Sequence, residues 1–88
     1  MKIVLHPTYA KHYHKRISSK TNLSNKTIER IKLFQHDLHH PLLKDHALAG
    51  THFGHRGFWI TGDIRIIYER VSENEVLFLD IGSHNQVY

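Results

Sequence analysis

The fold is decided by residues 58–81, which read FWITGDIRIIYERVSENEVLFLDI. Apolar residues occur here in short runs of β type, and polar turn residues separate the runs. The expected strands are residues 58–60, 64–69 and 76–81, with turns at 61–63 and 72–75. Three consecutive strands joined by short turns predict an antiparallel meander. The last strand is apolar on both faces except at Asp80, which predicts a central position in the sheet.

The beginning of the chain predicts a short strand and a first helix. Residues 2–6 have the composition of a strand, and Pro7 suits the first turn of a helix. Tyr9, Tyr13 and Ile17 then recur every four residues, which is the spacing of one helix face. We therefore expect an amphipathic helix that buries these three side chains.

A second helix is predicted between a polar link at residues 18–22 and Pro41. Ser24 is a candidate N-cap, and Pro41 should end the helix near His39 because it disfavours helical geometry in the residue before it. The apolar stripe of this helix comprises Ile28, Ile31, Leu33, Phe34 and Leu38. The order β-α-α-β-β-β predicts an α+β fold, an antiparallel-rich sheet with both N-terminal helices on one face.

Length and composition limit the function classes. The 88 residues suffice for one domain, residues 1–88, with a modest core. Apolar runs are far shorter than the roughly 20 residues that span a bilayer, so we expect no membrane association and a cytoplasmic location. There is no cysteine, which excludes disulfides and thiolate–zinc sites. The net charge of +4 suits a polyanion or an acidic protein partner, although it is also compatible with a charge excess that serves solubility.

Arg65 interrupts the aliphatic pattern on the face opposite Ile64 and Ile66. One interpretation is an ordinary outward arginine on a half-exposed strand. The other is an arginine held on an uncovered sheet face, where it can grip a phosphate with two parallel hydrogen bonds.

His46 and His84 are the candidate acid–base residues, because both lie in segments that flank strands. Two imidazoles that converge on one phosphodiester can act together near neutral pH, one neutral and one protonated. Arginine or lysine would stabilise the developing charge, and this chemistry requires no metal or other cofactor. With ten histidines in the chain, several must be surface residues without a function.

Three further residues have two interpretations each. Tyr88 is either a core residue that anchors the C-terminal segment or a stacking platform for a base, and Trp59 has the same ambiguity. Asp63 is a turn residue in the simpler interpretation and a carboxylate that orients an imidazole in the other. His36 and His40 have the spacing of two metal ligands on a helix, but no glutamate follows His36 and Pro41 displaces His40 from the helix.

Three segments carry a resemblance to a known family. They are residues 44–50 (KDHALAG), residues 63–68 (DIRIIY) and residues 82–88 (GSHNQVY). In this order and spacing they resemble the RelE/YafQ family of toxins from bacterial toxin–antitoxin pairs, small ribonucleases that cut mRNA on the ribosome. The resemblance implies a RelE-like microbial ribonuclease fold and no cofactor.

The resemblance also implies roles for individual residues. His46 and His84 would transfer protons, with His46 as base and His84 as acid or the reverse. The other implied roles are charge stabilisation by Arg65 and Arg56, orientation by Asp63, and substrate binding by Tyr88, Lys44 and Trp59. The chain departs from the YafQ branch at Trp59, where the branch has a histidine, and at Asp80, where it has an arginine.

The function implied by this resemblance is cleavage of mRNA at the ribosomal A site by attack of the ribose 2′-OH. The implied partners are the ribosome, mRNA and a cognate acidic antitoxin, which would form a toxin–antitoxin hetero-oligomer with this chain. Two alternatives stay open. One is a ParE-like toxin that binds gyrase without cutting RNA, and the other is an inactive relic that only binds protein.

Overall fold

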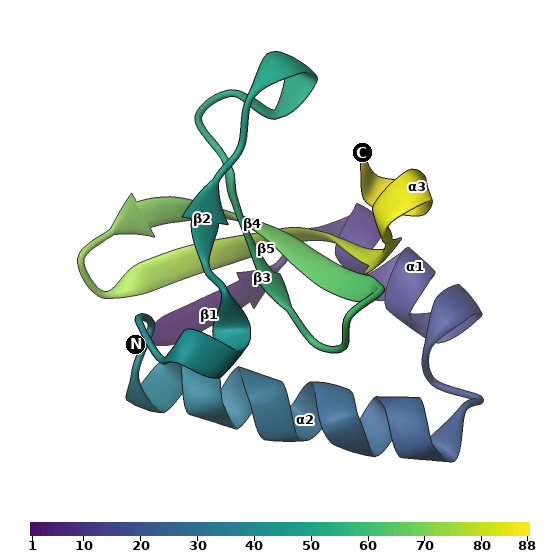
Figure 1. Ribbon diagram of the computed structural model, residues 1–88. Helices are drawn as coiled ribbons and strands as arrows, with labels where there is room; N and C mark the ends of the chain where they lie inside the picture. Colours follow the sequence, from purple (N-terminus) through teal and green to yellow (C-terminus); the bar gives the residue numbers. More distant parts are fainter.

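A five-stranded sheet forms the centre of the protein, for which a computed structural model describes residues 1–88 (Figure 1). The strands are β1 (Lys2–Leu5), β2 (His46–Ala47), β3 (Arg56–Trp59), β4 (Ile64–Ser72) and β5 (Glu75–Ser83). Their order is β1-β5-β4-β3-β2, in which β1 pairs with β5 in parallel and every other pair is antiparallel. The predicted meander and the central position of the last strand are confirmed.

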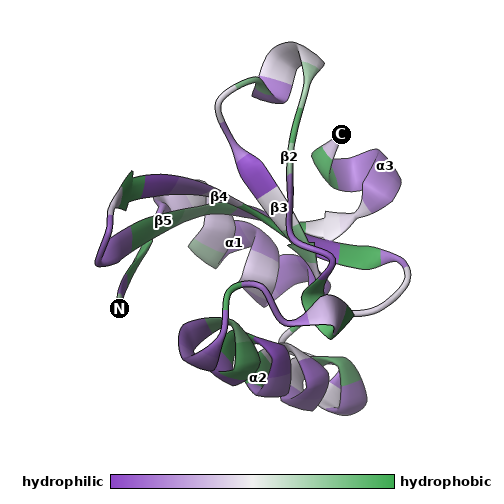
Figure 2. Ribbon diagram, turned by 60° about the vertical axis from the view of Figure 1, so that its left-hand side comes forward, coloured by the Kyte–Doolittle hydropathy of each residue, from purple (hydrophilic) through white to green (hydrophobic).

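Two helices from the N-terminal half pack on one face of the sheet and enclose the core. They are α1 (Pro7–Arg16) and α2 (Thr21–His36). In Figure 2 hydrophilic and hydrophobic residues alternate along α2, as expected for a helix with one buried face. The buried core comprises Tyr9, Ile17, Phe34, Leu43, Phe58, Ile60, Ile66, Tyr68, Val76, Phe78 and Ile81. None of the helices is long and apolar enough to cross a membrane. The expected α+β class is confirmed.

The second helix differs from the prediction at both ends. It begins at Thr21 with Lys20 in the N-cap position, so the expectation that Ser24 caps it is wrong. Ser24 Oγ instead lies 2.9 Å from the Tyr13 hydroxyl and joins the two helices. The helix ends at His36 rather than near His39, because Asp37 is extended and its carboxylate accepts the His39 N–H at 3.0 Å.

Short elements missing from the prediction connect α2 to the meander. They are the 3₁₀ turns η1 (Pro41–Leu43) and η2 (Gly50–His52) and the two-residue strand β2 between them. Strand β3 covers Arg56–Trp59 rather than residues 58–60, and both later strands are longer than expected. The segment between β2 and β3 projects from the sheet beside the short C-terminal helix α3 (His84–Val87), as both views show (Figures 1 and 2).

A bulge in β5 changes which residues face the core. Ile67 pairs with Asp80 and Tyr68 pairs with Phe78, which leaves Leu79 as the extra residue. Residues directly opposite each other share a face, so Asp80 lies on the face of Ile67, and Gly82 lies on the face of its partner Arg65. This face carries the polar residues of the candidate site, and side chains of α1 reach it at Asp80 and Gly82 along the edge of β5.

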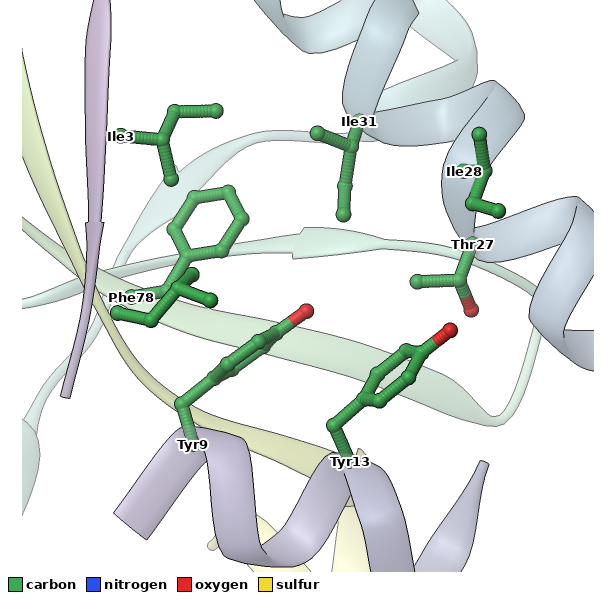
Figure 3. A pocket seen from close by; sticks show the side chains of 8 residues that line it. Ile3, Tyr9, Tyr13, Thr27, Ile28, Ile31 and Phe78 are labelled. Carbon is green, nitrogen blue, oxygen red and sulfur yellow. The ribbon is translucent and has the colours of Figure 1, made fainter. Parts of the chain in front are cut away.

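An apolar pocket of about 370 Å³ remains between β1, α1 and α2 (Figure 3). Its lining comprises Ile3, Leu5, Tyr9, Tyr13, Thr27, Ile28, Ile31 and Phe78. The ring of Tyr9 is buried, yet its hydroxyl points into this pocket without a hydrogen-bond partner (Figure 3). Burial, and to a smaller extent Tyr13, raises the pKa of Tyr9 well above that of free tyrosine. Leu5 and Ile28 leave the rim of the pocket apolar and exposed.

Candidate active site

The segment after β2 and helix α3 enclose a pocket of about 420 Å³. His46 lines it from β2, and His84 and Tyr88 line it from the C-terminal segment. His46 and His84 are 38 residues apart in sequence, and they meet because the segment after β2 projects from the sheet beside α3 (Figure 1). The remaining lining residues are Ala47, Leu48, Ala49, Gly50, Thr51 and His52. The structure therefore brings the two predicted acid–base residues to one pocket.

The backbone before His46 fixes which ring nitrogen can accept a proton. His46 Nδ1 lies 2.8 Å from the carbonyl oxygen of Lys44. A carbonyl oxygen only accepts, so Nδ1 carries the hydrogen and Nε2 retains its lone pair. Lys44 is the only non-glycine residue with a positive φ, 48°, and this left-handed conformation ends η1 two residues before His46. The free lone pair of Nε2 is therefore the position at which His46 could accept a proton.

Asp45 anchors this segment to the sheet. Its side chain is only 6% exposed and pairs with Arg56 Nε at 3.2 Å. The Tyr68 hydroxyl lies 2.9 Å from both carboxylate oxygens and donates its single proton to them. Burial and the Asp45 charge raise the pKa of Tyr68, so the phenol remains a donor. No role for Asp45 is predicted from the sequence, although its position between Lys44 and His46 indicates that it lies close to the site.

His84 is the first residue of α3, and a capping box holds that helix. The Ser83 hydroxyl accepts the Gln86 N–H at 3.3 Å, and Gln86 Oε1 accepts the Ser83 N–H at 2.8 Å. One turn later, Tyr88 donates its N–H to the His84 carbonyl at 3.0 Å, and the two rings meet edge to face with centroids 4.5 Å apart. The short helix therefore fixes both predicted residues relative to each other.

Tyr88 packs against the sheet on one side and stays accessible on the other. A Cβ added to Gly57 would lie 3.2 Å from the Tyr88 hydroxyl, so a larger residue at this position in β3 would require the ring to shift slightly. The side chain of Tyr88 is 41% exposed, and His52 approaches its ring with centroids 6.0 Å apart. Partial burial raises its pKa, which the Arg65 charge partly offsets. The exposed side of the ring is compatible with a stacking surface for a base, which stays a prediction.

Arg65 lies beside Trp59 on the same face of the sheet. The two residues pair across β3 and β4, and the guanidinium carbon lies 4.6 Å from the indole centroid and 6.0 Å from the Tyr88 centroid. Lys44 Nζ also lies over the indole, at 5.2 Å. Arg65 donates from Nη2 to the Gly62 carbonyl at 3.2 Å, while its buried Nε has no partner. Trp59 therefore positions two cations next to the pocket.

Two other predicted site residues, Arg56 and Asp63, do not line the pocket of His46, His84 and Tyr88, the histidine pocket. Arg56 turns its Nε to Asp45, and Asp45, together with the Tyr68 hydrogen bond, raises its pKa despite the opposing effect of partial burial. Asp63 lies in the turn between β3 and β4, and its carboxylate contacts neither His46 nor His84. No group of three or more histidine, cysteine, aspartate or glutamate side chains is arranged to hold a metal ion.

Several solved bacterial toxins have the same fold. YafQ from Escherichia coli strain BL21(DE3) is 21% identical with a TM-score of 0.80, and the match covers 99% of this chain and 97% of that one. YafQ in the E. coli DinJ–YafQ toxin–antitoxin complex is 24% identical with a TM-score of 0.77, covering 99% and 96%. A copper-bound mutant toxin from Helicobacter pylori is 23% identical with a TM-score of 0.76, covering 100% and 99%. No curated protein sequence matches the chain.

These likenesses show that the chain has the fold of YafQ and YoeB/ParE toxins. Residues 1–88 match the family described as "Bacterial toxin of type II toxin-antitoxin system, YafQ". The chain belongs to the YafQ family of type II toxin–antitoxin toxins.

Proposed function

We propose that this toxin is an mRNA endoribonuclease that cuts at the ribosomal A site. The observation that carries the proposal is the common pocket of His46, His84 and Tyr88, with Arg65 beside it. This arrangement combines a base, an acid, an aromatic surface and a cation, which metal-independent cleavage of a phosphodiester requires. The pocket is shallow and the protein small, so the ribosome would supply most of the substrate binding.

The proposed reaction begins with the 2′-OH of the ribose on the 5′ side of the scissile phosphate. His46 Nε2 accepts its proton while the 2′ oxygen attacks phosphorus and forms a pentacoordinate phosphorane. The phosphorus–5′-oxygen bond then breaks, and protonated His84 delivers its proton to the leaving oxygen. The products are a 2′,3′-cyclic phosphate and a 5′-OH, so all atoms and protons are accounted for.

Arg65 and Tyr88 would assist without exchanging protons. The guanidinium of Arg65 stabilises the charge that develops on the phosphorane oxygens, and Tyr88 stacks on the base next to the cut. Lys44, Arg56 and Trp59 would support these contacts, Lys44 and Trp59 beside Arg65 and Arg56 from the other face of β3. Asp63 lies apart from both imidazoles, so orientation of an imidazole by this carboxylate is not part of the proposed mechanism.

The test is induction of the toxin in bacteria without a partner, followed by mapping of mRNA 5′ ends. We expect cuts within translated codons that disappear in the His84→Ala variant. His36→Ala is the matched control, because His36 is an exposed histidine at the end of α2 and does not line the pocket. Growth arrest with intact mRNA would instead indicate a gyrase-binding toxin, and the absence of arrest would indicate an inactive protein-binding relic.

We further propose that an acidic antitoxin binds this toxin in a hetero-oligomer, as DinJ and YafQ form a complex in E. coli. Two features support the proposal besides the net charge of +4. Strand β1 has a free edge, since it is the first strand of the sheet order. Beside it lies the apolar pocket of Figure 3, in which the Tyr9 hydroxyl has no partner. Co-expression with the adjacent genomic reading frame should yield a co-purifying complex, and Leu5→Lys should weaken it.

A further inference from the structure

A second groove lies on the other side of α3 from the histidine pocket. It has a volume of about 420 Å³ and lies between the C-terminal end of α1 and the adjoining ends of β4 and β5. Its lining comprises Lys15, Arg16, Lys20, Asp63, Ile64, Ser83 and Gln86. Three cations face one carboxylate here, so the groove is positively charged. No function is predicted for Lys15, Arg16 or Lys20 from the sequence.

Arg16 is held in this groove rather than extended into solvent. Its Nη1 donates to the carbonyl oxygen of Ile81 at 2.9 Å and lies 3.5 Å from Asp80 Oδ1. The side chain is only 19% exposed. A Cβ added to Gly82 would lie 2.7 Å from the same nitrogen, so the guanidinium passes close over Gly82. Gly82 is the cross-strand partner of Arg65, which places both arginines at one end of the same sheet face.

Asp80 would repel a polyanion on this face if its charge were free. Its Oδ1 instead lies 2.6 Å from His12 Nδ1 and accepts the Ile81 N–H at 2.8 Å. With these two closer partners, the carboxylate makes only a long contact with Arg16. The arginine therefore retains hydrogen-bonding capacity for another anion, since a guanidinium has five N–H donors.

We propose that Arg16, with Lys15 and Lys20, binds a backbone phosphate of the RNA strand next to the scissile phosphate. The inference rests on the proposed nuclease function, because it names a further contact of the same substrate. Helix α3 separates the groove from the histidine pocket, so a strand that passes over this short helix reaches both. Arg16 is a substrate-binding residue in this arrangement, and His12 and Asp80 are positioning residues.

The experiment measures binding of a fluorescent, 2′-O-methylated single-stranded oligoribonucleotide, which the enzyme cannot cut, across a salt series. For Arg16→Gln we expect at least about threefold weaker binding and a salt slope that is lower by about 0.7, the loss of one phosphate contact on a single strand. Lys15→Gln and Lys20→Gln should do the same. The side chains of these two lysines make no hydrogen bond within the protein, so their variants test the groove without disturbing the contact of Arg16 to Ile81.

The matched control is Lys32→Gln, which removes the same charge from an exposed position on α2 outside the groove. A lower slope in the three groove variants and an unchanged slope in the control supports the proposal. Equal effects in all four variants, no effect in the groove variants, or no binding by the wild type overturns it. Mapping of mRNA ends with His84→Ala reports the nuclease function separately, so either conclusion can fail while the other stands.

Discussion

The two buried tyrosines of the core offer a direct test of how the candidate base is held. Tyr68 is 1% exposed and Tyr9 is 4% exposed, but only Tyr68 has a hydrogen-bond partner, the Asp45 carboxylate. Tyr68→Phe removes one hydroxyl and leaves the ring in place. One proton serves both oxygens of Asp45, so the substitution removes one hydrogen bond to a charged acceptor, which contributes about 1.5–3 kcal/mol.

The second partner of Asp45 cannot compensate for this loss. Arg56 is 38% exposed, and a pair so open to solvent stabilises by only about 0.2–1 kcal/mol. We therefore expect Tyr68→Phe to lower the free energy of unfolding by about 2 kcal/mol in urea denaturation. This corresponds to a decrease in Tm of roughly 8–16 °C for a protein of this size. Because Asp45 precedes His46, mRNA cleavage should fall as well.

Tyr9→Phe is the matched control, since it removes a hydroxyl that points into the apolar pocket and has no hydrogen-bond partner in the protein. Its free energy of unfolding should stay within about 0.5 kcal/mol of the wild type. A double-mutant cycle of Tyr68→Phe with Asp45→Asn should give a coupling free energy of about 1 kcal/mol or more. Equal destabilisation by the two Tyr→Phe variants, or a cycle without coupling, would refute the idea that this hydrogen bond anchors the segment.

Three further predictions concern the pocket and the core. Arg65→Gln should lower the cleavage rate on purified ribosomes by about a hundredfold, and Trp59→Ala by less, because the indole only positions the guanidinium. Gly57→Ala adds a methyl 3.2 Å from the Tyr88 hydroxyl and should displace that ring, which NMR shifts of the neighbouring His84 ring would detect. Burial raises the pKa of Tyr9, whereas an unfolded tyrosine ionises near pH 10. Stability should therefore decrease as the pH rises above about 10, and in urea titrations Tyr9→Phe should make this decrease shallower by about 1.4 kcal/mol per pH unit.

Much of the fold can be predicted from the local pattern of apolar and polar residues. The elements that were not predicted lie where the sequence has no such pattern. Alternation in residues 64–69 and the apolar run of residues 76–81 are strong signals, because each strand buries at least one whole face. The two residues of β2 are too few to show a period. Ser24 has the composition of an N-cap, but the backbone turns earlier and tertiary contact with Tyr13 determines its position. The bulge at Leu79 has no local signal either.

The candidate site is less accessible to pattern than the fold. The local sequence does not indicate that His46 and His84 line one pocket. That expectation came from the resemblance to RelE/YafQ toxins. The burial of Asp45 could not be predicted, since an aspartate between two polar residues has the pattern of a solvated loop. Arg16 was overlooked for the opposite reason, because a basic residue in the last turn of a helix is already explained by the helix dipole.

The pairing of β1 with β5 has a consequence for how the toxin is made. Lys2 pairs with Glu75, so β1 has no strand partner until more than seventy further residues have been synthesised. Contacts between such distant parts of a chain form late and make folding slow. Strand β5 must then enter between β1 and β4, and His84 follows directly behind it. A nascent chain would thus lack the pocket of His46, His84 and Tyr88 until nearly all of its residues have emerged.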